Sequence, residues 1–276
     1  MDRSSFFIKD KALFGSYPTQ ESVNELENKG IRYFINLTCD GEKNILQYST
    51  KYNYIHFPIT DNSIPKNINV FSQFISTTCN IIKNLLNDDK IYLHCKGGHG
   101  RAGLVVASIL VIYYNISSEK ALYLTNKYHS YRLNMNEKWR KIGSPQTYTQ
   151  KKFVNDLFCT LYVNSKNPTF SINTYHNIIL KDIGHFFSIK DAFLAIKKLV
   201  NDHTKWNKIK KIVMFILLYN KFNNDIVLKS CLLNTGFKHI IYKNLDINTS
   251  SDDIDYNIIG KLLIKVRTQL LNNEIF

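Results

Sequence analysis

The stretch HCKGGHGRAG, from His94 to Gly103, indicates the fold of this chain and holds four of its 11 glycines. The residues KIYLH that end at His94 have the β-branched and aromatic content of a strand. The residues from about Arg101 to Tyr114 form an apolar run that is typical of a buried helix. The sequence therefore predicts a strand, a glycine-rich loop and a helix in direct succession.

Within this loop, a cysteine and an arginine stand six positions apart, at Cys95 and Arg101. Glycines let the backbone adopt positive φ and turn its N–H groups toward one anion. The helix that begins at Arg101 adds the positive end of its dipole at the same point. This environment favours the thiolate of Cys95 and the binding of a phosphate dianion above the sulfur. Arg101 can hold two phosphate oxygens with its planar guanidinium.

The Cys-x5-Arg spacing resembles the protein tyrosine phosphatase superfamily, and in particular its dual-specificity branch. The resemblance covers roughly residues 6–161 and implies a cysteine-dependent phosphatase that forms a phosphocysteine intermediate and uses no metal or other cofactor. It implies that Cys95 attacks phosphorus, that Arg101 holds the phosphate, and that His94 orders the loop and tunes the thiolate. The implied substrate-binding positions are Lys96, Gly97, Gly98, His99, Gly100 and Ala102.

Two flanking segments extend the resemblance. FPITDNSIP, residues 57–65, resembles the general-acid loop of the branch, which implies that Asp61 protonates the leaving oxygen. Asp-Asn is also ordinary turn chemistry, so a purely structural Asp61 is the alternative. SPQTYTQ, residues 144–150, resembles the glutamine-bearing segment, and a helix with Ser144 as N-cap and Pro145 in its first turn is predicted. Gln146 and Gln150 would then share one helical face and orient the hydrolytic water, unless they are simply solvated.

Ala102 departs from the family pattern, in which Ser or Thr commonly follows the arginine and bonds the cysteine sulfur. Without that hydroxyl, we expect slower release of the phosphocysteine, while the attack by Cys95 persists. Phosphotyrosine, phosphoserine or phosphothreonine in proteins are the expected substrates. The basic side chains of Lys96 and His99 leave a polyanionic lipid or an RNA 5′ end as alternatives, and Ala102 leaves a phosphate-binding pseudophosphatase.

The surrounding sequence alternates between strand-like and helix-like segments. IRYFINLT, from Ile31, and YIHFPI, from Tyr54, read as strands. Helices are expected over ESVNELENKG, which closes at Gly30, over residues 70–86 and from about Ser118. This alternation predicts an α/β fold with a central, mostly parallel sheet flanked by helices, over residues 1–164.

The remaining residues, 165–276, are expected to form a second, mainly helical α+β domain beyond the polar stretch NSKNP. Ser188 and Asp191 make a capping box ahead of an apolar helix. Further helices are predicted over residues 206–220, 225–234 and 257–271, and the segment HIIYK reads as a strand.

This second part resembles the NADAR (YbiA-like) family through an ordered set of residues: Trp206, Met214, Lys221, Phe222, Leu232, Leu233, Asn234, Thr235, Gly236, Asn257, Gly260, Val266 and Arg267. That resemblance implies cleavage of N-glycosidic bonds in ribosylated substrates. Lys190 stands where the family's glutamate is expected, with Asp191 beside it, so the carboxylate for such chemistry is missing. We therefore expect a degenerate domain that binds a nucleotide-like ligand or only supports the phosphatase.

Composition limits the remaining function classes. A formal net charge of +14 favours anionic substrates without forming a concentrated basic tail. The amino-terminal MDRSSFFIKD lacks the apolar core of a signal peptide, and the apolar runs are too short for stable membrane insertion. The five cysteines, an odd number without regular spacing, fit a reducing compartment, and no His or Cys set has metal-ligand spacing. We expect a cytoplasmic protein.

Overall fold

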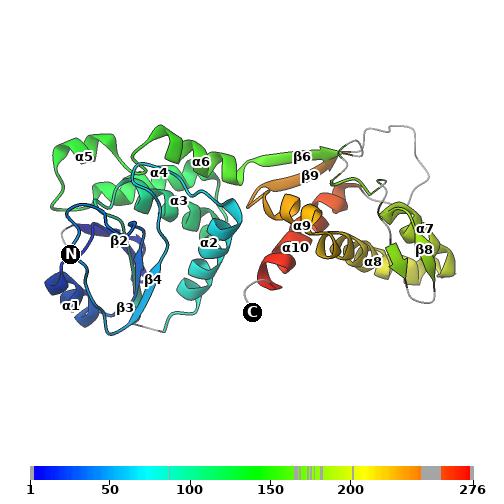
Figure 1. The fold of residues 1–276 in the computed structure, drawn as a ribbon, viewed down its shortest axis with the longest axis horizontal. Coiled ribbons are helices and arrows are strands. Elements are labelled where there is room, and N and C mark those ends of the chain that lie inside the picture. The colour runs from blue at the N-terminus through cyan, green and yellow to red at the C-terminus, as the bar shows by residue number, and fades with distance from the viewer. Residues whose placement is uncertain are drawn as a thin grey trace. The chain divides into compact units, whose positions relative to one another are not determined.

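The computed structural model describes residues 3–86, 88–164, 167, 169–172, 174, 176, 178–180, 183–200, 202–243 and 256–273. The chain forms two compact units, Met1–Phe158 and Cys159–Phe276 (Figure 1). Each unit has its own secondary structure and its own core, so each is described by itself.

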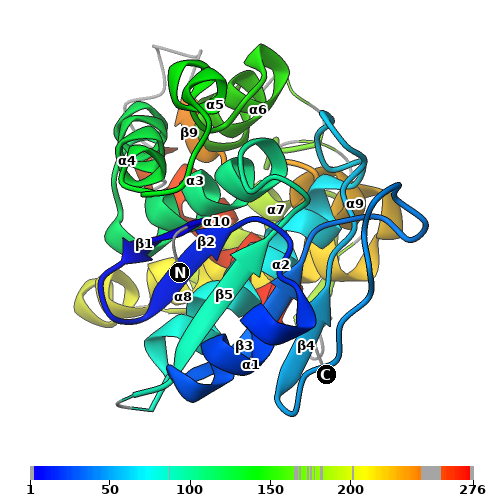
Figure 2. The same cartoon turned by 90° about the vertical axis from the view of Figure 1, so that its left-hand side faces the viewer.

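The first unit is built on a five-stranded sheet with the order β1-β2-β5-β3-β4 (Figure 2). The strands β2, β5, β3 and β4 run parallel to one another, and β1 pairs with β2 in the antiparallel direction. Because β5 and β3 lie inside the sheet, their residues are largely buried, which explains their nearly continuous apolar sequence. The strand bounds are β1 Ser4–Ile8, β2 Ala12–Gly15, β3 Ile31–Asn36, β4 Asn53–His56 and β5 Lys90–His94.

Helices cover both faces of this sheet, with α1 on the face opposite α2 and α3 (Figure 1). The most deeply buried is α3, whose residues from Gly100 to Leu110 are all buried. The α/β fold with a mostly parallel sheet is thus confirmed. The helix bounds are α1 Gln20–Asn28, α2 Ile68–Lys83, α3 Gly100–Tyr114, α4 Ser118–Ser130, α5 Glu137–Ile142 and α6 Tyr148–Phe158.

The expected helix that starts at Pro145 is wrong, and α6 begins only at Tyr148. The peptide bond between Ser144 and Pro145 is cis. The Ser144 hydroxyl does not cap a helix; it donates a hydrogen bond of 2.7 Å to the carbonyl of His99. A tertiary contact to the glycine loop therefore uses the side chain that was expected to start the helix.

The second unit combines two small sheets with four helices in its described residues. Strand β6 (Thr160–Asn164) pairs in parallel with β9 (His239–Lys243), and β7 (Ile178–Leu180) forms an antiparallel hairpin with β8 (Gly184–Phe186). The core centres on aromatic and aliphatic side chains such as Trp206, Phe193 and Leu263. The helices are α7 Ile189–Leu199, α8 His203–Asn224, α9 Ile226–Leu233 and α10 Tyr256–Asn273.

Two local expectations for this unit can be compared with the structure. The Ser188 hydroxyl accepts a hydrogen bond of 3.1 Å from the Asp191 N–H, so the predicted helix start is confirmed. The expected boundary after residue 164 differs from the observed division between Phe158 and Cys159. The reason is that β6 pairs with β9 and so belongs to the second unit. Residues 244–255, which precede the Asn257 of the NADAR resemblance, lie outside the described residues.

Within the described ranges, no helix combines the length and the apolar content needed to cross a membrane. The same residues contain no group of three or more His, Cys, Asp or Glu side chains that could hold a metal ion.

Candidate active site

The glycine loop begins where β5 ends, because Cys95 directly follows His94, and it leads into α3 at Gly100. Gly98 has φ +75°, and a Cβ atom there would lie 2.3 Å from the carbonyl carbon of Gly15. Glycine is therefore needed at this position both for its backbone conformation and for the close approach of β2. The Tyr17 N–H also donates to the Lys96 carbonyl at 3.0 Å, which ties the loop to the end of β2.

The amino-terminus of α3 differs from those of α1, α2, α4 and α5, whose first N–H groups are capped by a side chain. His99 precedes α3, and its side chain makes no such hydrogen bond. The first N–H groups of α3 are consequently available to an anion beside Cys95. The binding of a phosphate at this helix start stays a prediction.

His94 lies immediately before Cys95 and is completely buried. Its Nε2 atom is 2.7 Å from the Tyr48 hydroxyl, and its ring packs against the edge of Tyr17 at a centroid distance of 4.9 Å. Burial, with the nearby His56 as a smaller cause, lowers the pKa of His94 to about 3. His94 is therefore neutral near pH 7, which suits an ordering role and not proton transfer.

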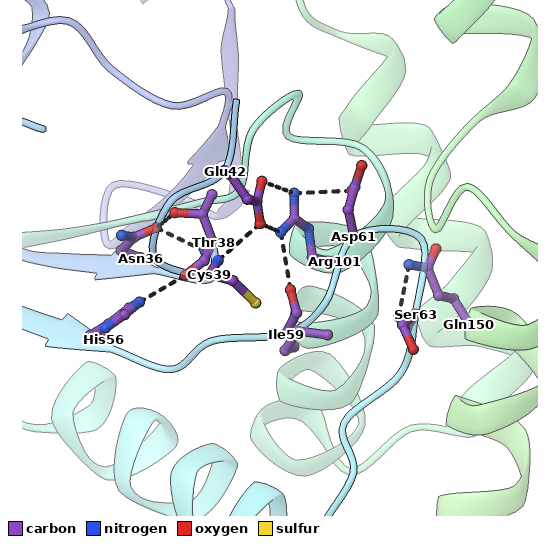
Figure 3. A network of polar contacts seen from close by, with 10 residues as sticks. All are labelled: Asn36, Thr38, Cys39, Glu42, His56, Ile59, Asp61, Ser63, Arg101 and Gln150. Atoms are coloured by element: carbon purple, nitrogen blue, oxygen red, sulfur yellow. Dashed lines mark hydrogen bonds and ion pairs between the residues drawn. The ribbon is translucent and has the colours of Figure 1, made fainter. Parts of the chain in front are cut away.

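Arg101 lies at the start of α3 with only 1% of its side chain exposed. Figure 3 shows its guanidinium between Glu42 and Asp61. Both terminal nitrogens bind Glu42, and Nη2 also lies 3.0 Å from Asp61 Oδ1. Nη1 donates to the Ile59 carbonyl at 3.0 Å. The Nε atom is buried and has no hydrogen-bond partner within the described part of the chain.

Glu42 is the site residue that the sequence did not reveal. It belongs to the loop after β3, whose carboxyl end lies beside that of β5 because the two strands are parallel. Its pKa is lowered: burial raises it, but the hydrogen bonds from Arg101 and from the Cys39 N–H outweigh burial. Burial lowers the pKa of Arg101. The hydrogen bond to Glu42 and the charges of Cys95, Glu42 and Asp61 have the opposite effect and outweigh burial, so the pKa of Arg101 is raised overall. The sequence feature that could have identified Glu42 is its position, because it is a carboxylate in the loop that follows β3, the strand beside β5.

Asp61 lies on the rim of the site, with 57% of its side chain exposed. The segment around it is also a turn, since the Ser63 N–H donates to the Thr60 carbonyl at 3.0 Å and Asn62 has φ +57°. Asp61 therefore belongs to a turn and also contacts Arg101, so the turn does not exclude a place in the site. The exposed carboxylate can reach a leaving group that arrives from solvent.

Both glutamines lie against the glycine loop, but not on one helical face, because Gln146 precedes α6. A Cβ atom at Gly100 would lie 2.9 Å from Gln150 Oε1 and 3.4 Å from Gln146 Cβ. Gln150 is completely buried, and its amide nitrogen donates to the Ser63 carbonyl at 3.1 Å. Gln150 thus connects α6 to the loop that carries Asp61.

The two basic side chains of the loop have different environments. Lys96 is exposed. His99 stacks on Trp139 at a centroid distance of 4.8 Å, and its Nδ1 lies 2.7 Å from His129 Nε2. Burial, with Arg132 as a further cause, lowers the pKa of His99 to about 4. Near pH 7, His99 therefore adds no positive charge, and the expectation of two cationic side chains in this loop is corrected to one.

Ala102 is completely buried in the first turn of α3, directly after Arg101. Gly97 is exposed, whereas Gly98 and Gly100 are buried. The side chain that follows the arginine is therefore a methyl group, which offers no hydrogen bond to a neighbouring sulfur.

This chain is similar to several known proteins. The family model "Polymorphic toxin system, DSP-PTPase phosphatase" matches residues 11–114. The protein designated tyrosine phosphatase 197R of Invertebrate iridescent virus 6 is 36% identical over 268 residues, covering 95% of this chain and 90% of that protein. The tyrosine phosphatase 067L of Invertebrate iridescent virus 3 is 42% identical over 167 residues, or 60% of this chain and 69% of that protein. Among solved structures, Tk-PTP in its active form has a TM-score of 0.44 at 20% identity, over 55% of this chain and 96% of that one.

The protein is a cysteine-based phosphatase of the tyrosine and dual-specificity class. The chain belongs to the tyrosine phosphatase family, and the similarity to 197R extends over both of its units.

Proposed function

We propose that the first unit hydrolyses phosphomonoesters with Cys95 as nucleophile, Arg101 as phosphate ligand and Asp61 as general acid. The observation that carries this proposal is the position of Arg101. Its buried guanidinium stands at the uncapped start of α3, and its Nε has no partner in the described structure. A phosphate oxygen could bind Nε and another could replace a carboxylate at Nη2.

In the first step, the Cys95 thiolate forms a bond to phosphorus while the bond to the leaving oxygen breaks. Asp61 gives that oxygen a proton, so the leaving group departs as a neutral alcohol or phenol. Arg101 and the loop N–H groups stabilise the charge on the other phosphate oxygens. In the second step, Asp61 takes a proton from water, whose oxygen attacks phosphorus and releases Cys95 and inorganic phosphate.

Asp61 lies 3.0 Å from Arg101 and must leave it to reach the leaving oxygen of a bound substrate. An arriving phosphate dianion can cause this release, because it supplies Arg101 with a stronger anionic partner. Glu42 can stay on the other side of the guanidinium, where it also accepts from the Cys39 N–H at 2.9 Å. Substrate binding would thus free the general acid for its role.

For the substrate, we propose phosphorylated protein side chains, in agreement with the tyrosine phosphatase relatives. A polyanionic lipid or an RNA 5′ end is less well supported, because His99 is neutral and Lys96 is then the one cationic side chain within residues 95–100. A pseudophosphatase would keep the phosphate site but accumulate no product.

For the second unit, we propose a supporting role. Its NADAR-like cations are buried and bonded to the protein: Lys221 Nζ donates to the Ser171 carbonyl at 2.8 Å, and Arg267 donates to the Thr235 hydroxyl at 2.7 Å. Burial lowers the pKa of Lys221 to about 8, against the opposing effect of Asp225. These contacts support a structural use of the residues that carry the NADAR resemblance, and a nucleotide-like ligand remains the alternative.

The test is hydrolysis of para-nitrophenyl phosphate in the presence of EDTA. Cys95→Ser should abolish turnover, while Cys231→Ser, an exposed cysteine on α9, should leave it unchanged. Rapid-mixing experiments on the wild type should give a burst of para-nitrophenol followed by slow turnover. Turnover in Cys95→Ser equal to that of the wild type would contradict the mechanism, and the absence of a burst and of turnover would favour the pseudophosphatase.

A further inference from the structure

A cavity of about 700 Å³ lies beside the phosphate site in the first unit. We call it the tyrosine cavity, because four of its lining residues are tyrosines. It is formed largely by the loop between β3 and β4. Its lining includes Asp40, Glu42 and the tyrosines Tyr17, Tyr48, Tyr52 and Tyr54.

The tyrosine cavity adjoins the phosphate site through three separate contacts. Glu42 lines the cavity and also binds Arg101. Tyr48 lines it and contacts His94 Nε2 at 2.7 Å. Asn36 lines it and pairs with His94 across β3 and β5. A molecule whose phosphate is bound at Arg101 would therefore have its neighbouring groups at the mouth of this cavity.

The charges of the cavity wall have one sign. Asp40 and Glu42 are its carboxylates, and no Lys or Arg occurs among the described residues that line it. Asp40 is exposed, as are Tyr52 and Tyr54. The nearby Lys96 belongs to the glycine loop, and its charge lowers the pKa of Glu42 from the phosphate side.

The tyrosine rings offer a second attraction for a cation. Aromatic faces carry negative potential and bind ammonium or guanidinium groups. One ring of this wall already does so, since the Arg32 guanidinium lies over the Tyr52 ring at 4.1 Å. Arg32 has its own carboxylate partner, Asp89, at 3.6 Å, so it leaves Asp40 available to another cation.

We propose that the tyrosine cavity is a substrate subsite for the side chain of a lysine or arginine that flanks the phosphorylated residue of a protein. This proposal rests on the proposed phosphatase function. Neighbouring residues of an extended peptide are about 3.3 Å apart along the chain, and a lysine or arginine side chain adds several ångströms of reach. A cation one or two positions from the phosphorylated residue can consequently reach Asp40 while the phosphate contacts Arg101.

The same wall disfavours the other substrate classes. The additional phosphates of an inositol lipid, or the backbone of an RNA, would face Asp40 and Glu42 without a cation in the lining to compensate. A nucleobase could stack on the tyrosines, but the phosphate that follows it would meet the same carboxylates. The cavity thus favours a cationic protein substrate over either polyanion.

The experiment compares kcat/KM for matched phosphotyrosine peptides that carry lysine, alanine or glutamate at each of the two positions on either side of the phosphotyrosine. A partly exposed ion pair with a cation–π contact corresponds to a preference of roughly three- to tenfold for lysine over alanine at one or more positions. Glutamate at the same position should lower kcat/KM below the alanine value. Equal values for the three peptides at every position would overturn the proposal.

Variants then assign the preference to the cavity. Asp40→Asn should reduce the lysine preference, and Asp40→Lys should reverse it in favour of glutamate, both with unchanged kcat/KM for para-nitrophenyl phosphate. Glu119→Gln is the matched control, because it removes an exposed carboxylate from α4 and should keep the preference. A lysine preference that persists in both Asp40 variants would contradict this site.

Para-nitrophenyl phosphate separates this proposal from the proposed function, because that substrate has no side chain to fill the cavity. Lack of its hydrolysis would contradict the phosphatase function itself. Hydrolysis of it, combined with kcat/KM values for a 5′-phosphorylated RNA or a soluble inositol phosphate above those of every peptide, would overturn the subsite alone.

Discussion

Arg101 is held by two carboxylates, and this pairing has an energetic reason. A buried guanidinium without a counter-charge costs several kcal/mol, so Arg101 needs an anionic partner. Glu42 supplies a planar, bidentate one, and Asp61 adds an exposed one. The charge of Arg101 is thereby compensated, and the exposed Asp61 can give way to a stronger anion.

Glu42→Gln tests this balance. We expect the free energy of unfolding to fall by about 1–3 kcal/mol, because the buried Arg101 loses its charged partner. Inorganic phosphate should restore part of this loss, since it supplies the missing charge. Thermal unfolding with and without phosphate measures both effects, and Glu119→Gln serves as control. If phosphate raises the Tm of Glu42→Gln no more than it raises the Tm of the wild type, Glu42 is not the counter-charge that stabilises Arg101.

Ala102→Ser tests the missing hydroxyl. If the phosphocysteine is released slowly for want of a hydrogen bond to sulfur, the variant should raise kcat by up to roughly tenfold, as one bond of about 1.5 kcal/mol permits. The burst should shrink relative to steady-state turnover. Ala107→Ser introduces the same hydroxyl at another buried position of α3 and should not raise kcat. An unchanged kcat in Ala102→Ser would mean that another step limits turnover.

At the level of elements, β5, the glycine loop and α3 could be predicted almost residue by residue. KIYLH matches β5, and α3 starts one residue before the expected position, because local apolar patterning and glycine content determine these segments. The segment around Pro145 could not be predicted, because the Ser144 hydroxyl donates its hydrogen bond to the carbonyl of His99, which is distant in the sequence. The Glu42–Arg101 pair joins the loop after β3 to the start of α3, which only the sheet brings together, so no local pattern contains it. The roles of Cys95, Arg101 and Asp61 stay predictions.

The histidines around this element predict a pH dependence of stability. Burial is the main cause that lowers the pKa of His94 and His129 to about 3 and of His99 to about 4. In the unfolded chain these groups take up protons below about pH 6.5, which the folded protein resists. Their stabilisation is therefore complete above that pH and is lost as pH falls toward 4, by up to about 1.4 kcal/mol per pH unit for each histidine.

Urea unfolding between pH 4 and pH 7, followed by a signal from the first unit, measures this slope. His129→Asn should make the slope shallower, since one depressed histidine is removed. His203→Gln is the control, because it removes a histidine of α8, which lies outside the first unit. Equal slopes for the wild type and His129→Asn would contradict the assignment of this dependence to the buried histidines.

On the scale of the whole molecule, the two units have separate cores. One buried cluster consists of residues from the first unit, such as Val23, Phe34 and Tyr92. Another consists entirely of residues from Val163 onward, including Trp206 and Phe222. Separate cores allow each unit to fold as its own cooperative domain.

We therefore expect residues 1–158, produced alone, to fold and to hydrolyse para-nitrophenyl phosphate with a kcat/KM within about twofold of the full chain. Calorimetry of the full chain should resolve two transitions, one of which matches the isolated unit. The same fragment with Cys95→Ser is the control for contaminating activity. A fragment that unfolds or loses activity would show that the second unit is required for the phosphatase.

The pairing of β6 with β9 has a consequence for the order of events during protein synthesis. Thr160 leaves the ribosome about 80 residues before its partner His239, which corresponds to several seconds or more of translation. All residues of the first unit have been made by then, so its sheet can close while β6 still lacks its neighbour. The nascent chain can thus complete the first unit before β6 finds its partner β9, and β6 presents an unpaired edge during that interval.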